Sequence, residues 1–174
     1  MDPGNLAALH MKMDAAMLEA PFAKAAIDVA AHDLLGRALG VPVYQLLGGK
    51  AQDDIKLYRA ISQIEPTAMA ANVAGYRDEG YTKFQLKVGA DADSDIERIR
   101  LCAAEMRPGD ILVADANTGW TARQTIDLSS KLADLGVVFI EHPLKTDDLA
   151  GQREVFAHSA LPILADESCQ TEAD

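Results

Sequence analysis

Three carboxylates and a lysine have the residue types and the spacing to do chemistry in this chain. Asp115, Glu141 and Asp166 each end a short apolar run, and successive members of the set are 26 and 25 residues apart. A carboxylate at the mouth of a buried strand is costly unless a cation or a donor pairs with it. Three converging carboxylates repel one another, and a divalent cation removes that repulsion. Ligands that are all oxygen favour Mg²⁺ or Mn²⁺ over zinc.

A candidate base lies in the run "KFQLK" at residues 83–87. Lys83, Gln85 and Lys87 share one face of this expected strand because strand side chains alternate. Lys87 is nearest the carboxyl end, so it is the first candidate for the catalytic lysine, and Lys83 is the second. A partly desolvated lysine near a metal has a lowered pKa and can accept a proton near neutral pH. Such a lysine can remove the proton next to a metal-bound carboxylate, and the metal then stabilises the enediolate.

Each of these residues also has a purely structural interpretation. A single strand-end carboxylate caps the following helix or pairs with a surface lysine, and a single lysine at a strand end is usually solvated. Three carboxylates at the ends of consecutive strands favour the metal site instead. Asn117 and Glu167 then become groups that orient the metal ligands or reach nearby lysines.

The elements that must position these residues follow from the hydrophobic pattern. Apolar residues recur at helical spacing from Leu6 to Met17, Pro21 can open a second helix, and Gly40 can end it. Beyond Lys56, short apolar strands alternate with amphipathic helices, which predicts a parallel sheet. The expected strands are 56–62, 83–88, 110–117, 137–144 and 161–168, and the expected helices are 66–80, 91–106, 121–136 and 147–159.

Two α/β architectures produce this alternation, a β/α barrel and a doubly wound sheet. The ends of barrel strands converge on one mouth, where catalytic groups from several strands meet. An open sheet would spread the three carboxylates along a line. No glycine-rich phosphate loop follows the first strand, which disfavours a dinucleotide-binding fold. We therefore predict an α/β fold with a partial TIM-like (β/α) barrel of about five strands.

Composition excludes several classes of function. The chain of 174 residues has a net charge of −11 and a pI near 4.7, which argues against a nucleic-acid partner. No apolar run approaches the ~20 residues of a membrane span, and the N-terminus does not resemble a signal peptide. The two cysteines, Cys102 and Cys169, form no disulfide framework. We expect a reduced, cytoplasmic protein with no membrane partner.

Four segments resemble the mandelate racemase and muconate lactonizing enzyme family of the enolase superfamily. They are "AKAAIDVAAHDLLGRALGVPVYQLLGG", "QLKVG", "DAN" with "IEHP", and "LADES". The resemblance implies Asp115, Glu141 and Asp166 as Mg²⁺ ligands and Lys87 as a base. It also implies that residues 1–50 are the helical part of a capping domain. Residues 51–174 are then the N-terminal portion of the barrel, truncated after the fifth strand.

Two positions depart from the family pattern. Members often carry two lysines separated by one residue, and here the first of these is Gln85. Gln85 cannot lower the pKa of Lys87 by like-charge repulsion, although it can donate a hydrogen bond to a substrate. His142 stands where an acidic or amide residue commonly follows the metal-binding glutamate, and we interpret it as a neutral donor beside the site.

The implied activity is Mg²⁺-dependent removal of the proton α to the carboxylate of a small-molecule substrate, through an enediolate. Racemisation, epimerisation or dehydration would follow, with a hydroxyproline or a betaine-like acid as an expected substrate. One alternative is a cycloisomerase of the same family, which uses the same metal and lysine. Another, from a different class, is a catalytically incomplete fragment or interaction module that associates through its strand edges. We expect a homo-oligomer, and we expect the second acid/base residue to lie outside this chain.

Overall fold

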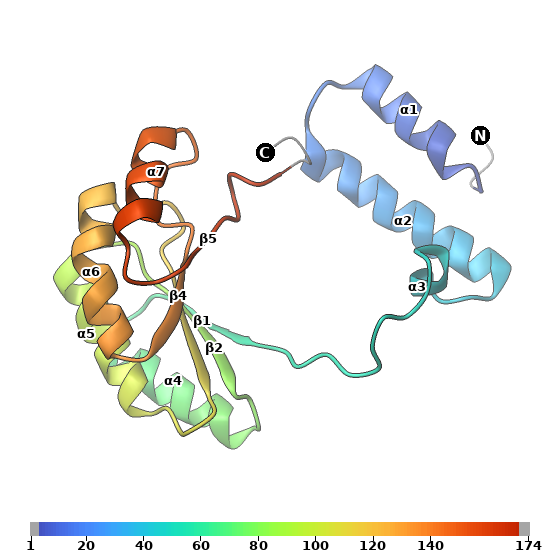
Figure 1. The fold of residues 1–174 in the computed structure, drawn as a ribbon. Coiled ribbons are helices and arrows are strands. Elements are labelled where there is room, and N and C mark those ends of the chain that lie inside the picture. The colour runs from blue at the N-terminus through green and yellow to red at the C-terminus, as the bar shows by residue number, and fades with distance from the viewer. Residues whose placement is uncertain (1–3, 171–174) are drawn as a thin grey trace. The chain divides into compact units, whose positions relative to one another are not determined.

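A computed structural model of the chain describes residues 4–170. Internal contacts divide the chain into two compact units, residues 1–55 and residues 56–174. The first unit is helical, and the second alternates strands with helices (Figure 1). No helix within residues 4–170 is long and apolar enough to cross a membrane.

The helical unit begins and ends its helices where the sequence predicts. The Asn5 side chain caps the first helix by accepting a hydrogen bond from the Ala8 amide. Pro21 opens the second helix, and Gly40 ends it with a left-handed φ of 69° that glycine adopts without strain. The three helices are α1 (Leu6–Ala16), α2 (Pro21–Leu39) and α3 (Val43–Leu46).

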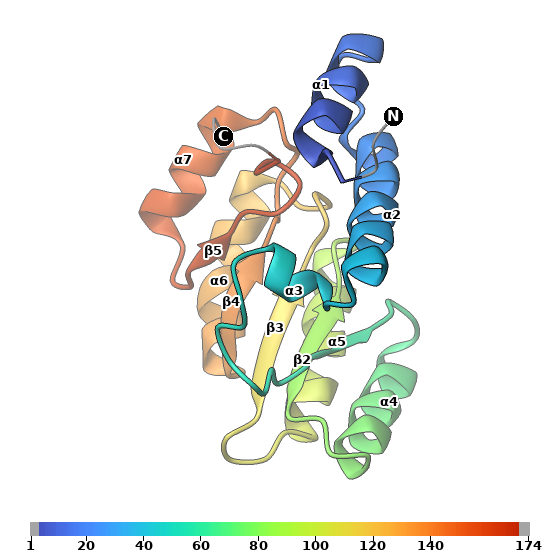
Figure 2. The same ribbon diagram turned by 90° about the vertical axis from the view of Figure 1, so that its right-hand side faces the viewer.

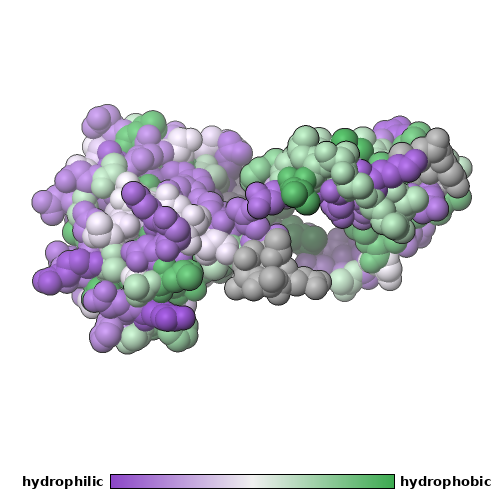
Figure 3. Space-filling model, turned by 90° about the horizontal axis from the view of Figure 1, so that it is seen from above, coloured by the Kyte–Doolittle hydropathy of each residue, from purple (hydrophilic) through white to green (hydrophobic). Residues whose placement is uncertain are grey.

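The helical unit has almost no core of its own. Of its helical residues, only Gly36 is buried, whereas Leu18 and Phe22 are 89% and 84% exposed. Apolar surface, green in Figure 3, covers much of the face of this unit that the figure shows. The ion pair Lys24–Asp14 and a hydrogen bond between His10 and Asp28 join α1 to α2, but an exposed ion pair contributes only about 0–1 kcal/mol. These helices therefore need further apolar packing to be stable.

The second unit contains a five-stranded parallel sheet in the order β1-β2-β3-β4-β5. A helix connects each strand to the next, and all four of these helices lie on one face of the sheet (Figures 1 and 2). Strands in sequential order are typical of a barrel, because a doubly wound sheet reverses its order. The predicted α/β fold is confirmed. Its elements are β1 (Arg59–Ile61), α4 (Pro66–Asp78), β2 (Lys83–Lys87), α5 (Ala92–Ala104), β3 (Ile111–Asp115), α6 (Ala122–Asp134), β4 (Val137–Glu141), α7 (Leu149–His158) and β5 (Ile163–Leu164).

The core lies between the sheet and its four helices. Alternate residues of each strand face the helices, and burying their apolar area is the main favourable term in folding. Lys83, Gln85 and Lys87 alternate with this set and therefore occupy the opposite face of β2. The buried apolar residues include Phe84, Leu86, Leu112, Ala114 and Ile140 of the strands, and Met69, Val73, Ile99 and Leu132 of the helices.

Each strand is shorter than predicted, and β5 differs most. The sequence predicts a fifth strand over 161–168, whereas only Ile163 and Leu164 pair, and only with β4. An edge strand has one neighbour to hold it straight, so its pairing ends early. Asp166 consequently lies in the loop beyond β5. β4 similarly ends at Glu141, shortly before Pro143, which has no amide to donate to the sheet.

The two cysteines should differ strongly in reactivity. Cys102 is fully buried in α5, and desolvation, with the charge of Glu105 adding, raises the pKa of its thiol to about 12. Cys169 is exposed. Because the thiolate is the reactive form, a thiol reagent at neutral pH should modify one cysteine per folded chain, and the second only in denaturant. Peptide mapping should assign the fast site to Cys169, and Cys169→Ser should remove it; fast labelling of Cys102 in the folded chain would contradict this.

Candidate active site

The carboxyl ends of β2, β3 and β4 bring three of the predicted residues side by side. Lys87 is the register partner of Asp115, and Asp115 is the partner of Glu141. The row continues from Glu141 to Leu164 of β5, two residues before Asp166. Parallel strands end at one edge, so the lysine and the carboxylates meet there.

Both carboxylates within the row have hydrogen-bond donors. Asp115 is fully buried, and its Oδ2 accepts a hydrogen bond of 2.5 Å from Lys87 Nζ. Its Oδ1 accepts one of 3.0 Å from the amide of Asn117. Glu141 Oε2 accepts one of 2.5 Å from Gln85 Nε2. These donors meet the requirement that buried charge be paired.

The acidic neighbours of Lys87 raise its pKa. Burial lowers this pKa, but the hydrogen bond from Lys87 to Asp115 and the negative charges of Asp115 and Glu141 outweigh burial. The amine of Lys87 is the counter-ion of Asp115 in this structure. The lowered pKa of a lysine beside a bound metal stays a prediction.

The carboxylates of the site act on one another. Burial raises the pKa of Glu141, and the negative charges of Asp115 and Asp166 raise it further, against the lowering effects of Gln85 and Lys87. Asp166, which is exposed, is therefore close enough to repel Glu141. A positive charge near Glu141 would relieve this repulsion.

The loops after β3, β4 and β5 are joined by the remaining predicted residues. Asn117 Nδ2 donates to Glu167 Oε1 (3.1 Å), and the Asp166 amide donates to His142 Nδ1 (3.0 Å). Because Nδ1 accepts, a neutral His142 carries its proton on Nε2. Asn117 and His142 have φ angles of 42° and 34°, and backbone strain of this kind is concentrated at functional sites.

Lys83 is separate from the row of charges, by which we mean Lys87, Asp115 and Glu141 at the carboxyl ends of β2, β3 and β4. It starts β2 and pairs in register with Ile111, about 13 Å along the strand from Lys87. It lines a depression of about 350 Å³ on the open face of the sheet, together with Gln85, Phe139 and Glu141. The structure therefore brings Lys87, but not Lys83, to the carboxylates.

The donor chemistry of the site fits a hard divalent cation, although the side chains are not gathered around one point. Within residues 4–170, no three His, Cys, Asp or Glu side chains lie close enough together to hold a metal ion. Asp115 instead pairs with Lys87, and Glu141 with Gln85. All three candidate ligands supply carboxylate oxygens, which suit Mg²⁺.

Two family profiles match the chain. Residues 1–48 match the family described as Mandelate racemase / muconate lactonizing enzyme, N-terminal domain. Residues 68–174 match the one described as Enolase C-terminal domain-like. The chain belongs to the mandelate racemase/muconate lactonizing enzyme family of the enolase superfamily. The resemblance predicted from the four sequence segments is thereby confirmed.

Relatives within this family carry out several reactions. The chain is 49% identical over 166 residues to a cis-3-hydroxy-L-proline dehydratase of Roseibium aggregatum, covering 95% of this chain and 44% of the relative. It is 31% identical over 171 residues to an N-succinyl-L-Arg/Lys racemase of Bacillus cereus, covering 98% of this chain and 46% of the relative. The chain thus spans less than half the length of these relatives.

Solved structures of the family share the fold closely. The N-succinyl Arg/Lys racemase of Bacillus cereus matches with a TM-score of 0.93 and 30% identity, over 99% of this chain and 47% of that one. A dipeptide epimerase of Enterococcus faecalis, complexed with Mg and the dipeptide L-Leu-L-Tyr, matches with a TM-score of 0.89 and 34% identity. That match covers 97% of this chain and 48% of the epimerase.

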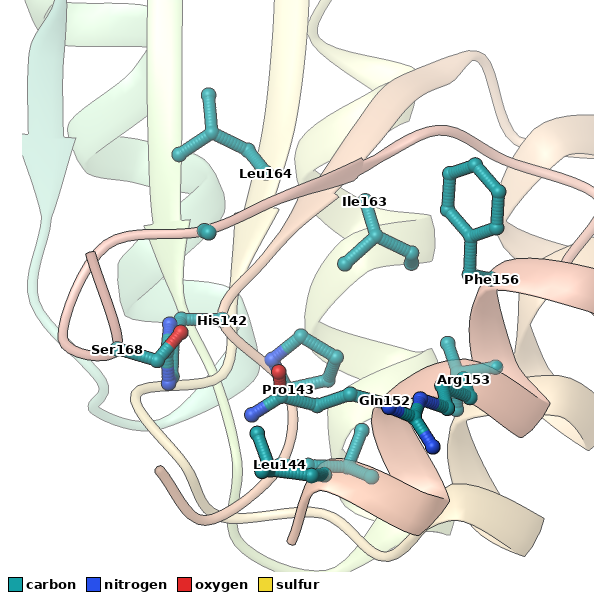
Figure 4. Close-up of a pocket in the computed structure, with 12 residues that line it drawn as sticks. His142, Pro143, Leu144, Gln152, Arg153, Phe156, Ile163, Leu164 and Ser168 are labelled. Atoms are coloured by element: carbon teal, nitrogen blue, oxygen red, sulfur yellow. The ribbon is translucent and has the colours of Figure 1, made fainter. Parts of the chain in front are cut away.

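A second hollow in this family member lies beside the row of charges. It is a groove of about 420 Å³ between α7 and the segments around β4 and β5 (Figure 4). Of the predicted site residues, His142 is the one that lines this groove, and neither Lys87 nor any candidate metal ligand does. Its walls are mainly apolar, so the charged row is the better candidate active site. The groove is lined by His142, Pro143, Leu144, Leu149, Gln152, Arg153, Val155, Phe156, Ile163, Leu164, Ala165 and Ser168.

Sequence reasoning missed a close backbone approach next to the row. Gly89, after β2, has a φ of 101°, and a Cβ there would lie 2.1 Å from the Ala116 carbonyl oxygen. A Cβ on Gly119, after β3, would lie 2.0 Å from the Gly89 carbonyl oxygen. Only glycine allows this approach at both positions. A glycine directly after the strand that carries Lys87 was the available signal.

Gly119→Ala should therefore destabilise the chain. The new methyl group meets backbone rather than a flexible side chain, and such overpacking costs about 1–3 kcal/mol in free energy of unfolding. Urea unfolding measures the change. Gly75→Ala is the matched control, since no atom lies within 4 Å of its added Cβ and alanine favours the helix. Equal stability of the two variants would contradict the close approach.

Proposed function

We propose that the protein carrying this chain removes the proton α to the carboxylate of a small-molecule substrate, and so racemises, epimerises or dehydrates it. The observation that carries the proposal is the register of Lys87, Asp115 and Glu141 across three parallel strand ends. One basic group and two acidic groups at a single mouth suit proton abstraction next to a bound carboxylate. The reactions named for the relatives support it.

Asp115, Glu141 and Asp166 would hold Mg²⁺, or Mn²⁺, which has the same preference for oxygen ligands. When bound, the ion supplies positive charge that stabilises the negative charge developing on the substrate carboxylate. Asp115 and Glu141 are already held by neighbouring donors, Lys87 and Gln85. The charge of Asp166 also reaches Glu141.

Lys87 would be the base. Its amine donates to Asp115 at the carboxyl end of β2, where the carboxylates of the neighbouring strands also end. Lys83 has a lesser part, because it lies at the other end of β2.

The remaining polar residues would orient the ligands. Gln85 fixes Glu141 by its hydrogen bond and has a second amide hydrogen for a substrate. Asn117 and Glu167 join the loops after β3 and β5. His142 fixes the backbone of Asp166 by accepting from its amide. Groups that orient metal ligands in this way typically change metal affinity 10- to 100-fold when removed.

A hydroxyproline-type amino acid is the first substrate class to test. The relative named cis-3-hydroxy-L-proline dehydratase is 49% identical, whereas the relatives named as racemase and epimerases are 31–36% identical. Dehydration needs a leaving group on the β-carbon, which a 3-hydroxyproline supplies. Racemisation or epimerisation of an amino-acid derivative is the second candidate.

The test is incubation of the protein with Mg²⁺ in D₂O, followed by mass spectrometry of the acid. Dehydration should appear as loss of water from cis-3-hydroxy-L-proline, and epimerisation as deuterium at the α-carbon of the recovered acid. EDTA should abolish either reaction. Neither change across amino, hydroxy and sugar acids would refute the proposal and favour the interaction module. The homo-oligomer and the cytoplasmic location stay predictions.

A further inference from the structure

A buried aspartate outside the row of charges binds donors from several loops. Asp95 is fully buried in the first turn of α5, and it has no part in the chemistry proposed above. Its Oδ2 accepts from Gly89 N (2.9 Å), Ala90 N (2.9 Å) and Trp120 Nε1 (3.0 Å), and its Oδ1 accepts from Arg98 Nη1 (3.0 Å) and Gln63 Nε2 (3.3 Å).

Four of the five donors come from three successive strand ends, and the fifth, Arg98, comes from α5 itself. Gln63 follows β1, Gly89 and Ala90 follow β2, and Trp120 follows β3. A buried carboxylate that loses its partners is strongly destabilising, so these loops must stay close to Asp95. The ion pair with Arg98 balances its charge.

This cluster connects to the row of charges by short paths. Gly89 is two residues from Lys87, and the intervening Val88 amide donates to the Asp115 carbonyl (2.9 Å). The Trp120 amide donates to the Pro143 carbonyl (2.9 Å), in the loop after β4. The loops that Asp95 binds are thus the ones that hold Lys87 and the ends of β3 and β4.

We propose that Asp95 is a positioning residue that fixes the ends of β2 and β3 so that Lys87 faces Asp115. The effect of Asp95 on catalysis rests on the proposed function, whereas its positioning of the strand ends does not. An acidic residue in the first turn of a helix usually stabilises the helix through its interaction with the helix dipole. The cap of α5, however, is Asp91, which accepts a hydrogen bond from the Ser94 amide. Asp95 binds loops instead.

The first test compares Asp95→Asn with Asp91→Asn by amide hydrogen exchange. Asparagine keeps the size of the side chain but removes the charge and one acceptor oxygen. Asp95→Asn should speed exchange about tenfold or more at Val88 and Ala116. Neither amide is hydrogen-bonded to Asp95. The Val88 amide donates to the Asp115 carbonyl, and the Ala116 amide donates to the Glu141 carbonyl. Asp91→Asn should leave both amides unchanged.

Trp120 is the single tryptophan of the chain, so its indole N–H resonance reports on the cluster directly. Trp120→Phe removes one donor and keeps the carboxylate, so it should also speed exchange at Val88 and Ala116, but by a smaller factor. This variant serves if Asp95→Asn fails to fold. Unchanged exchange at Val88 and Ala116 in the folded variants would overturn the proposal.

The second test is Mg²⁺ titration of the same variants. Asp95→Asn should weaken Mg²⁺ binding by about 10- to 100-fold, as expected for groups that orient ligands, and Asp91→Asn should not. Equal affinities would overturn the proposal. If the unaltered chain itself binds no Mg²⁺, the exchange measurement alone decides the role of Asp95.

Discussion

Lys87→Met should lower the rate of hydrogen exchange at the substrate α-carbon by about 10²- to 10⁴-fold, the range for loss of a general base. Methionine keeps the length of the side chain but can neither accept nor donate the proton. The rate is followed in D₂O with the whole protein, Mg²⁺ and the acid that the protein turns over.

Two further variants make this result specific. Lys131→Met, on the exposed surface of α6, should keep the original rate. Lys83→Met should have a smaller effect than Lys87→Met, because Lys83 starts β2 and does not reach the carboxylates. Lys87→Met also leaves Asp115 without its ion pair, so circular dichroism must show that the variant is folded. A folded Lys87→Met protein with the original exchange rate would exclude Lys87 as the base.

Phe84→Ala should lower the free energy of unfolding by about 3–5 kcal/mol, the range for removing a large aromatic side chain from a core. Phe84 is 1% exposed on the helix-covered face of β2, and β2 also carries Gln85 and Lys87. Urea unfolding followed by the fluorescence of Trp120 measures the change. A loss of this size is a large part of the roughly 5–15 kcal/mol that usually stabilises a domain.

The matched control is Phe156→Ala, the same substitution at a side chain that is 84% exposed on α7. Its effect should stay within about 0.5 kcal/mol, as for most surface substitutions. If the two variants lost equal stability, the sheet would not be packed on its helices as described here.

Much of the fold follows from periodicity. The run before Asp115 is apolar because every residue of β3 after Ile111 is buried, and the amphipathic segments between strands are the helices that cover one face of the sheet. The row of Lys87, Asp115 and Glu141 follows from the same reasoning, since parallel strands end at one edge. Gln85, which stands where family members often have a lysine, has a local role in this chain, because its amide donates to Glu141.

Other features depend on contacts that no local pattern encodes. Asp95 looks like an acidic residue at the start of a helix, and two of its partners, Gln63 and Trp120, are 32 residues before it and 25 after it. The ion pair between Lys87 and Asp115 depends on how the ends of β2 and β3 meet, so identifying it required the structure. The length of β5 depends on how many neighbours the strand has, which the strand's own residues do not determine.

Calorimetric titration of Mg²⁺ into the 174-residue chain tests whether Asp115, Glu141 and Asp166 form one metal site. Asp115→Asn removes one ligand charge, and Asp127→Asn, on the surface of α6 beside Arg123, is the control. We expect Mg²⁺ binding that Asp115→Asn abolishes and Asp127→Asn leaves intact. Binding that survives Asp115→Asn, or no binding by any form of the protein, would contradict a metal site built on these three carboxylates.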